Sequence, residues 1–173
     1  MTGKQEQFIP GIYRQHILAG VIIAGHQRAG IDTHGGGTGA EGSHITATFG
    51  QQLMITLYDT VAATVYTQAW LADDHQWIFT GLPTEIPTVL GRGSIGPAVS
   101  VRAHGEDRHR ARYDSDSHTA IVRVGSLTWT VQDQVAADSM LDAWRHIAEL
   151  APIILGRQAP ARRHRKPGPR TTR

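Results

Sequence analysis

Apolar and polar residues alternate along several short stretches of the chain. Ile45, Ala47 and Phe49 alternate with threonines, and this period of two is typical of a strand that is buried on one face. The stretches expected to form strands are part of 12–25, then 45–49, 53–57, 77–79, 98–103, 108–113, 120–124 and 127–131. The strands at 98–103 and 108–113 are expected to pair as a hairpin that turns at residues 105–107.

Two other stretches show the period of a helix. Apolar residues recur at every fourth position, as Ala62, Tyr66 and Trp70 in the first and as Ala136, Met140 and Trp144 in the second. This spacing predicts two amphipathic helices. Asp59 and Asp133 precede them, where a carboxylate accepts hydrogen bonds from the amides that open a helix. We therefore expect each aspartate to cap a helix and each tryptophan to anchor the core.

These strands and helices belong to a repeat within the chain. Residues 45–70 and 120–144 align with a gap of one residue, which lies in the turn between the two strands. The identical pairs are Gly50 with Gly125, Leu53 with Leu127, Thr56 with Thr130, Asp59 with Asp133, Val61 with Val135, Ala62 with Ala136, Ala63 with Ala137, Ala69 with Ala143 and Trp70 with Trp144. The repeat predicts an α+β fold with an antiparallel sheet, two amphipathic helices on one face, and an internally duplicated ββα unit related by a pseudo-twofold axis.

The chain is expected to form one domain with two tails. Residues 1–11 are polar and read as a flexible N-terminus. Residues 12–156 form a single α+β domain of two similar halves, about 12–75 and 98–156, joined by a crossover rich in glycine and proline. Residues 157–173 read as a disordered basic tail, because clustered guanidinium groups repel one another and bury no apolar surface.

Composition excludes several classes of site and of location. The chain of 173 residues has no cysteine, which excludes disulfides, zinc–thiolate sites and thiol nucleophiles. The apolar run from Ile17 to Ala24 is much shorter than the roughly 20 residues of a membrane span. The first residues lack the basic start and the continuous apolar run of a signal peptide. We expect a cytoplasmic protein that does not contact membranes.

Charge is distributed unevenly along the chain. Residues 157–173 carry seven of the 17 basic residues and no acidic one, so residues 1–156 hold ten basic residues against all 15 acidic ones. The tail residues expected to bind a polyanion are Arg157, Arg162, Arg163, Arg165, Lys166 and Arg170. Such a tail neutralises phosphates with weak, salt-sensitive affinity, although a purely solubilising tail has the same composition.

The glycine-rich segments do not predict a nucleotide or another cofactor. Residues 91–96 match G-x-G-x-x-G by letter, but Pro97 and an alternating stretch follow them instead of a helix. The glycines at 35–37 and 39 lack the lysine and the following helix of a P-loop. We therefore expect no bound cofactor.

Histidines and acidic residues concentrate between His104 and His118. If this stretch is catalytic, the candidate residues are His104, His109, His118 and Asp107. If a metal binds, the candidate ligands are His44, His104 and His118. No standard ligand spacing occurs, and the neighbouring arginines oppose a bound cation. A solvated, charged segment without catalytic or metal-binding residues is the favoured interpretation.

Two functions follow from these observations. The first is a non-enzymatic binding or adaptor module whose basic tail contacts nucleic acid or an acidic protein. The alternative is a small hydrolase, dependent on a metal or on histidine, with its site in residues 104–118. The chain is also compatible with a homodimer, because the unpaired edge strands of a sheet can pair with those of a second copy.

Overall fold

The strands lie in two separate four-stranded sheets. The computed structural model describes residues 19–35, 42–50, 53–86 and 99–156. The strands are β1 (Ala19–Ile23), β2 (Ala29–His34), β3 (His44–Phe49), β4 (Leu53–Leu57), β5 (Val99–Ala103), β6 (His109–Asp114), β7 (Thr119–Val124) and β8 (Leu127–Val131). The helices are α1 (Thr60–Leu71), α2 (Trp77–Thr80) and α3 (Gln134–Ile154), with a 3₁₀ turn, η1, at Asp73–His75. The α+β class is confirmed.

The order of the strands joins the two halves of the chain. One sheet, here the β6 sheet, has the order β1-β8-β7-β6, and the other, the β2 sheet, has the order β2-β3-β4-β5. Consecutive strands pair antiparallel, but β1 pairs in parallel with β8, and β5 pairs in parallel with β4. The first strand of each half therefore adds to the last strand of the other half. The mostly antiparallel pairing is as predicted, but the strands form two sheets instead of the single sheet expected, and each sheet also contains a parallel pair.

The residues that cap the helices also link the two halves of the chain. Asp59 and Asp133 each accept a hydrogen bond from a backbone amide of the first helical turn, and both bonds are 2.7 Å long. The second oxygen of Asp133 accepts from Gly25 N at 2.8 Å, and that of Asp59 accepts from Gly105 N at 2.8 Å. Both predicted caps are confirmed. Each aspartate therefore also holds the turn after the strand that joins its sheet from the other half. These two pairs of hydrogen bonds are equivalent, while a shared origin of the halves stays a prediction.

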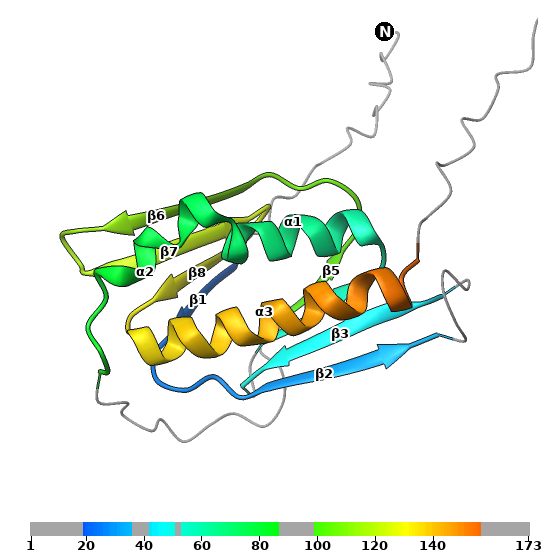
Figure 1. Ribbon diagram of the computed structural model, residues 1–173, viewed down its shortest axis with the longest axis horizontal. Helices are drawn as coiled ribbons and strands as arrows, with labels where there is room; N and C mark the ends of the chain where they lie inside the picture. The colour runs from blue at the N-terminus through cyan, green and yellow to red at the C-terminus, as the bar shows by residue number, and fades with distance from the viewer. Residues whose placement is uncertain (1–18, 36–41, 51–52, 87–98, 157–173) are drawn as a thin grey trace, which may run out of the picture.

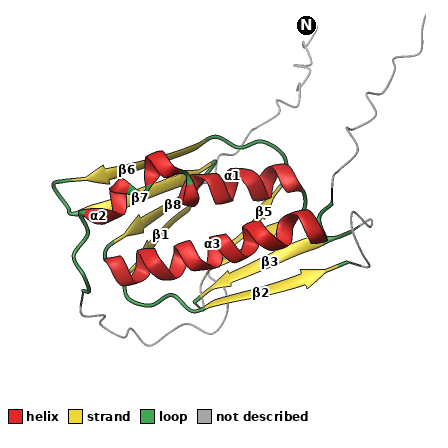
Figure 2. Ribbon diagram, in the orientation of Figure 1, coloured by secondary structure: helices red, strands yellow, loops and turns green. Residues whose placement is uncertain are grey.

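The two long helices lie side by side over the strands (Figures 1 and 2). Helix α1 packs against β6 and β7, whereas α3 packs against β2 and β3. Trp70, Trp129 and Trp144 are fully buried between the layers. The ring of Trp129 meets those of Trp70 and Trp144 edge-on, with centroids 5.6 and 6.5 Å apart. The expected role of Trp70 and Trp144 as core anchors is confirmed.

Two local expectations are wrong. Residues Trp77–Thr80 form the short helix α2 and not a strand; a run of three apolar residues is too short to show either period. The segments 98–103 and 108–113 do form β5 and β6, but they do not pair as a hairpin, because they lie in different sheets. The reason is that β5 finds its partner in β4, far away in the sequence.

Candidate anion-binding site

Strand β6 places arginines on the outer face of its sheet. Arg110 and Arg112 are exposed and alternate with half-buried residues that face the helices. Arg108, directly before the strand, continues the same alternation and is exposed. On the neighbouring strand β7, Arg123 lies in register with Arg110. We call Arg108, Arg110, Arg112 and Arg123 the arginine surface.

The arginine surface brings like charges together. Residues directly opposite each other on antiparallel strands have Cβ atoms about 5 Å apart, and like charges in such a pair are destabilising. Arg110 and Arg123 form such a pair, and Arg112 lies diagonally from Arg123. None of the ion pairs among the described residues involves an arginine of this surface. Arg123 Nε donates to the Gly125 carbonyl at 3.0 Å, which leaves its remaining N–H groups available to a ligand.

A cleft of about 800 Å³ opens at the turn end of the arginine surface. Three arginines and a single carboxylate contribute to its lining, which consists of Asp107, Arg108, His109, Arg110, Arg123, Gly125 and Ser126. We call it the arginine cleft. Gly125 has φ of 55°, and a Cβ atom there would lie 2.9 Å from the Asp107 carboxylate. This turn therefore requires glycine for its backbone angle and for the space that Asp107 occupies.

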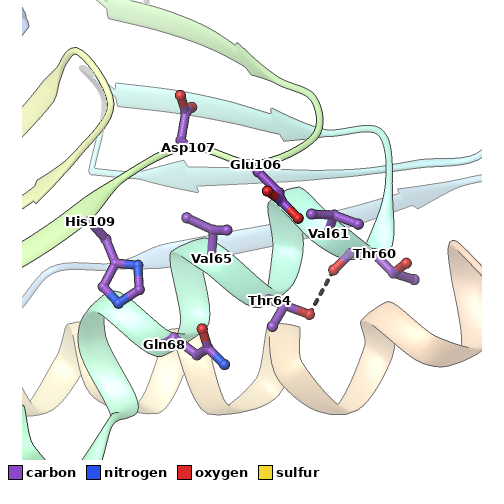
Figure 3. Close-up of a pocket in the computed structure, with 8 residues that line it drawn as sticks. All are labelled: Thr60, Val61, Thr64, Val65, Gln68, Glu106, Asp107 and His109. Atoms are coloured by element: carbon purple, nitrogen blue, oxygen red, sulfur yellow. Dashed lines mark hydrogen bonds between the residues drawn. The ribbon is translucent and has the colours of Figure 1, made fainter.

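A second cleft, of about 400 Å³, lies on the helix side of the same strand (Figure 3). It is lined by Thr60, Val61, Thr64, Val65 and Gln68 of α1 and by Glu106, Asp107 and His109. We call it the helix cleft. In Figure 3, Glu106 and His109 point towards α1, whereas the carboxylate of Asp107 points away. No hydrogen bond joins Asp107 to His109 among the described residues, so the two do not form an acid–base pair.

The remaining histidines of the predicted site lie apart from these clefts. His44 and His104 lie in one row on the outer face of the β2 sheet, with the ring of Tyr58 between them. The ring of Tyr58 stacks on His104 with centroids 4.4 Å apart, and His34 extends the row beyond His44 at 4.6 Å. Since the rings face one another, their nitrogens do not converge on one point.

His118 lies at the far end of β6. Its Nδ1 is 3.1 Å from the hydroxyl of Tyr113, which itself donates to the Gly81 carbonyl at 2.9 Å. The structure therefore brings His44 and His104 into one row and separates both from His118 and His109. In the part of the chain that the structure describes, no three side chains of His, Asp or Glu gather as a metal site would require.

The arginine surface was not identified from the sequence as a binding site. The tail residues predicted to bind a polyanion, Arg157 to Arg170, lie outside the described residues, as do the N-terminus 1–11, most of the first glycine-rich segment and most of the crossover. The arginines at 108, 110 and 112 were considered only as residues that oppose a metal. Their spacing of two on a predicted strand was the available signal, because it places them on one face.

Comparison with known proteins adds no functional information. No family model, curated protein or solved structure matches this chain. None of the helices in the described ranges is both long enough and apolar enough to cross a membrane.

Proposed function

We propose that the protein is a non-enzymatic binding or adaptor module for an anionic partner in the cytoplasm. The observation that carries the proposal is the register pairing of Arg110 with Arg123, which places two exposed arginines opposite each other. Neither arginine forms an ion pair among the described residues. Such a pair lowers stability in the absence of a ligand. A bound carboxylate or phosphate removes the repulsion and accepts the forked hydrogen bonds that guanidinium groups donate.

The distribution of charge supports an acidic protein as the partner of the folded domain. Acidic residues bound the arginine surface at both ends, with Glu106 and Asp107 before β6 and Asp114 and Asp116 at its far end. A long nucleic acid that followed the arginines would also meet these carboxylates, which repel phosphates. A short acidic segment of a protein fits between them. The basic tail, Arg157 to Arg173, is the part of the chain suited to sequence-independent contact with nucleic acid.

Substitution of paired arginines tests the role of the surface. We expect the Arg110→Gln and Arg123→Gln double variant to bind a fluorescent glutamate-rich peptide more weakly than the parent chain, as measured by anisotropy at low salt. The matched control is Arg102→Gln with Arg145→Gln, which removes two exposed charges elsewhere. Equal binding by both double variants would show that the arginine surface is not the contact.

Removal of residues 157–173 tests the tail separately. The truncated chain should retain binding to the glutamate-rich peptide and lose most of its binding to single-stranded DNA of random sequence, with a reduced dependence on salt. If the truncated chain retains DNA as well as the full chain does, the tail does not bind nucleic acid.

A further inference from the structure

Strand β6 has one edge that no described strand covers. It is the last strand of its sheet, with β7 as its neighbour on one side, and Figure 1 shows it at the rim of the molecule. Gly125 N donates to the Arg108 carbonyl at 2.9 Å. In an antiparallel ladder, the backbone groups of alternate residues point to opposite sides. The N–H and C=O groups of Arg110 therefore point towards β7, and those of His109, Ala111 and Tyr113 point outward.

The same alternation separates the side chains along this edge. The arginines lie on the outer face, and His109, Ala111 and Tyr113 are half-buried on the helix side. A cleft lies on each side of the turn end of the strand, the arginine cleft outside and the helix cleft inside, and His109 lines both. An extended chain laid along β6 would direct its side chains alternately towards these two surfaces.

We propose that β6 binds an extended acidic peptide as a fifth strand of the β6 sheet. Backbone hydrogen bonds to the outward groups of His109, Ala111 and Tyr113 hold the peptide. Carboxylates at alternate positions of the peptide pair with Arg110 and Arg112, and small apolar side chains at the positions between them face Val61 and Val65 of the helix cleft. This inference rests on the proposed binding of an anionic partner and adds the kind of partner and its mode of binding.

Charge distinguishes this edge from the other outer edge of the fold. The residues that correspond to Arg108, Arg110 and Arg112 at the other edge are Arg28, directly before β2, and Gly30 and Asp32 within it. That edge therefore carries one arginine and one carboxylate, so it complements an acidic strand less well than the edge of β6 does. The six residues of β6 span about 20 Å, which sets the length of peptide that the edge can hold.

The experiment compares two peptides of identical composition against the full chain. In the first, Glu and Val alternate over the six residues that match β6; in the second, the glutamates and the valines form two blocks. We expect the alternating peptide to bind at least about tenfold more tightly. A preference that is absent in an Arg110→Gln and Arg112→Gln double variant, and retained in the Arg102→Gln and Arg145→Gln control, supports pairing with the arginine surface.

N-methylation of the peptide tests the backbone contacts without any change to the protein. In an added antiparallel strand the amides of the valines face β6, and in a parallel strand those of the glutamates do. We expect methylation of one set to weaken binding at least about tenfold, and methylation of the other set to leave it almost unchanged.

The possible results separate this inference from the proposed function. Arginine-dependent binding that is insensitive to both methylation and alternation would overturn strand addition and leave the proposed function standing. Binding of both peptides that is insensitive to the arginine substitutions would overturn both. Two further results contradict an acidic peptide as the partner: tighter arginine-dependent binding of single-stranded DNA to the chain truncated after residue 156, and sedimentation showing a dimer that the arginine substitutions dissociate.

Discussion

Replacement of Asp133 by alanine tests whether one buried carboxylate holds the two halves of the fold together. Asp133 is fully buried and accepts hydrogen bonds from three backbone amides. One is Ala136 N in the first turn of α3, and the others are Gly25 N, after the exchanged strand β1, and Ile86 N, at the start of the crossover. The substitution therefore removes a helix cap and two long-range contacts at once.

The expected loss of stability follows from these contacts. Loss of a helix cap costs about 1 kcal/mol, and a hydrogen bond to a charged group contributes about 1.5–3 kcal/mol. The bond from Gly25 N, at 2.8 Å, is short, whereas that from Ile86 N, at 3.2 Å, lies at the long end of the range. We expect Asp133→Ala to lower the free energy of unfolding by about 3–5 kcal/mol.

Urea denaturation followed by circular dichroism and tryptophan fluorescence measures this loss. Asp59→Ala, which removes two such bonds, should cost less than Asp133→Ala. Asp133→Asn should also be costly, because its side-chain NH₂ group would replace one of the two acceptor oxygens and would face a backbone N–H donor. The control is Asp138→Ala, an exposed position of the same helix, with an expected effect within about 0.5 kcal/mol. A loss of only about 1 kcal/mol for Asp133→Ala would refute the reasoning, because the cap alone accounts for it.

Three further substitutions test the core and the turn beside the arginine cleft. Burial, with a smaller contribution from Asp107, raises the pKa of Tyr66 from 10.0 to about 12. The folded chain therefore holds this proton more tightly than the unfolded chain, so the free energy of unfolding should fall as pH rises from 10 towards 12; Tyr66→Phe, measured in the same denaturation series, should reduce that fall. Gly125→Ala should destabilise the chain by about 1–2 kcal/mol, because alanine disfavours a positive φ and clashes with the Asp107 carboxylate; Gly125→Ala with Asp107→Ala should recover part of the loss, and no recovery would exclude the clash. Trp144→Ala should cost about 3–5 kcal/mol, measured by thermal unfolding, because it leaves a cavity in the core; a loss below 1 kcal/mol would contradict its role as an anchor.

Local patterns were sufficient to predict the elements that carry the core. The alternation in 45–49 predicted β3, whose residues do alternate between buried and half-buried. Asp59 and Asp133 were recognised as caps because a cap depends on amides only two or three residues away. The pattern was less informative for α1, which is buried around more of its surface than an amphipathic helix because it packs against both α3 and the β6 sheet.

Only part of the candidate site could be predicted from local sequence patterns. The spacing of Arg108, Arg110 and Arg112 is visible in the sequence, but the pairing of Arg110 with Arg123 depends on the register of β6 with β7. His109 and Asp107 were identified as neighbours in a charged stretch. That both residues line two clefts, one on each side of β6, depends on the approach of α1 to β6.

The sequence by itself determined the α+β class, most strands, both long helices, their caps and their tryptophan anchors. Only the tertiary structure decided that β1 joins β8 and β5 joins β4, and hence that β6 has an edge that no described strand covers. The physical reason is the range of the interactions. Periodicity and capping depend on residues a few positions apart, whereas these strand pairings join backbone groups 46 positions apart for β4 with β5 and 108 positions apart for β1 with β8.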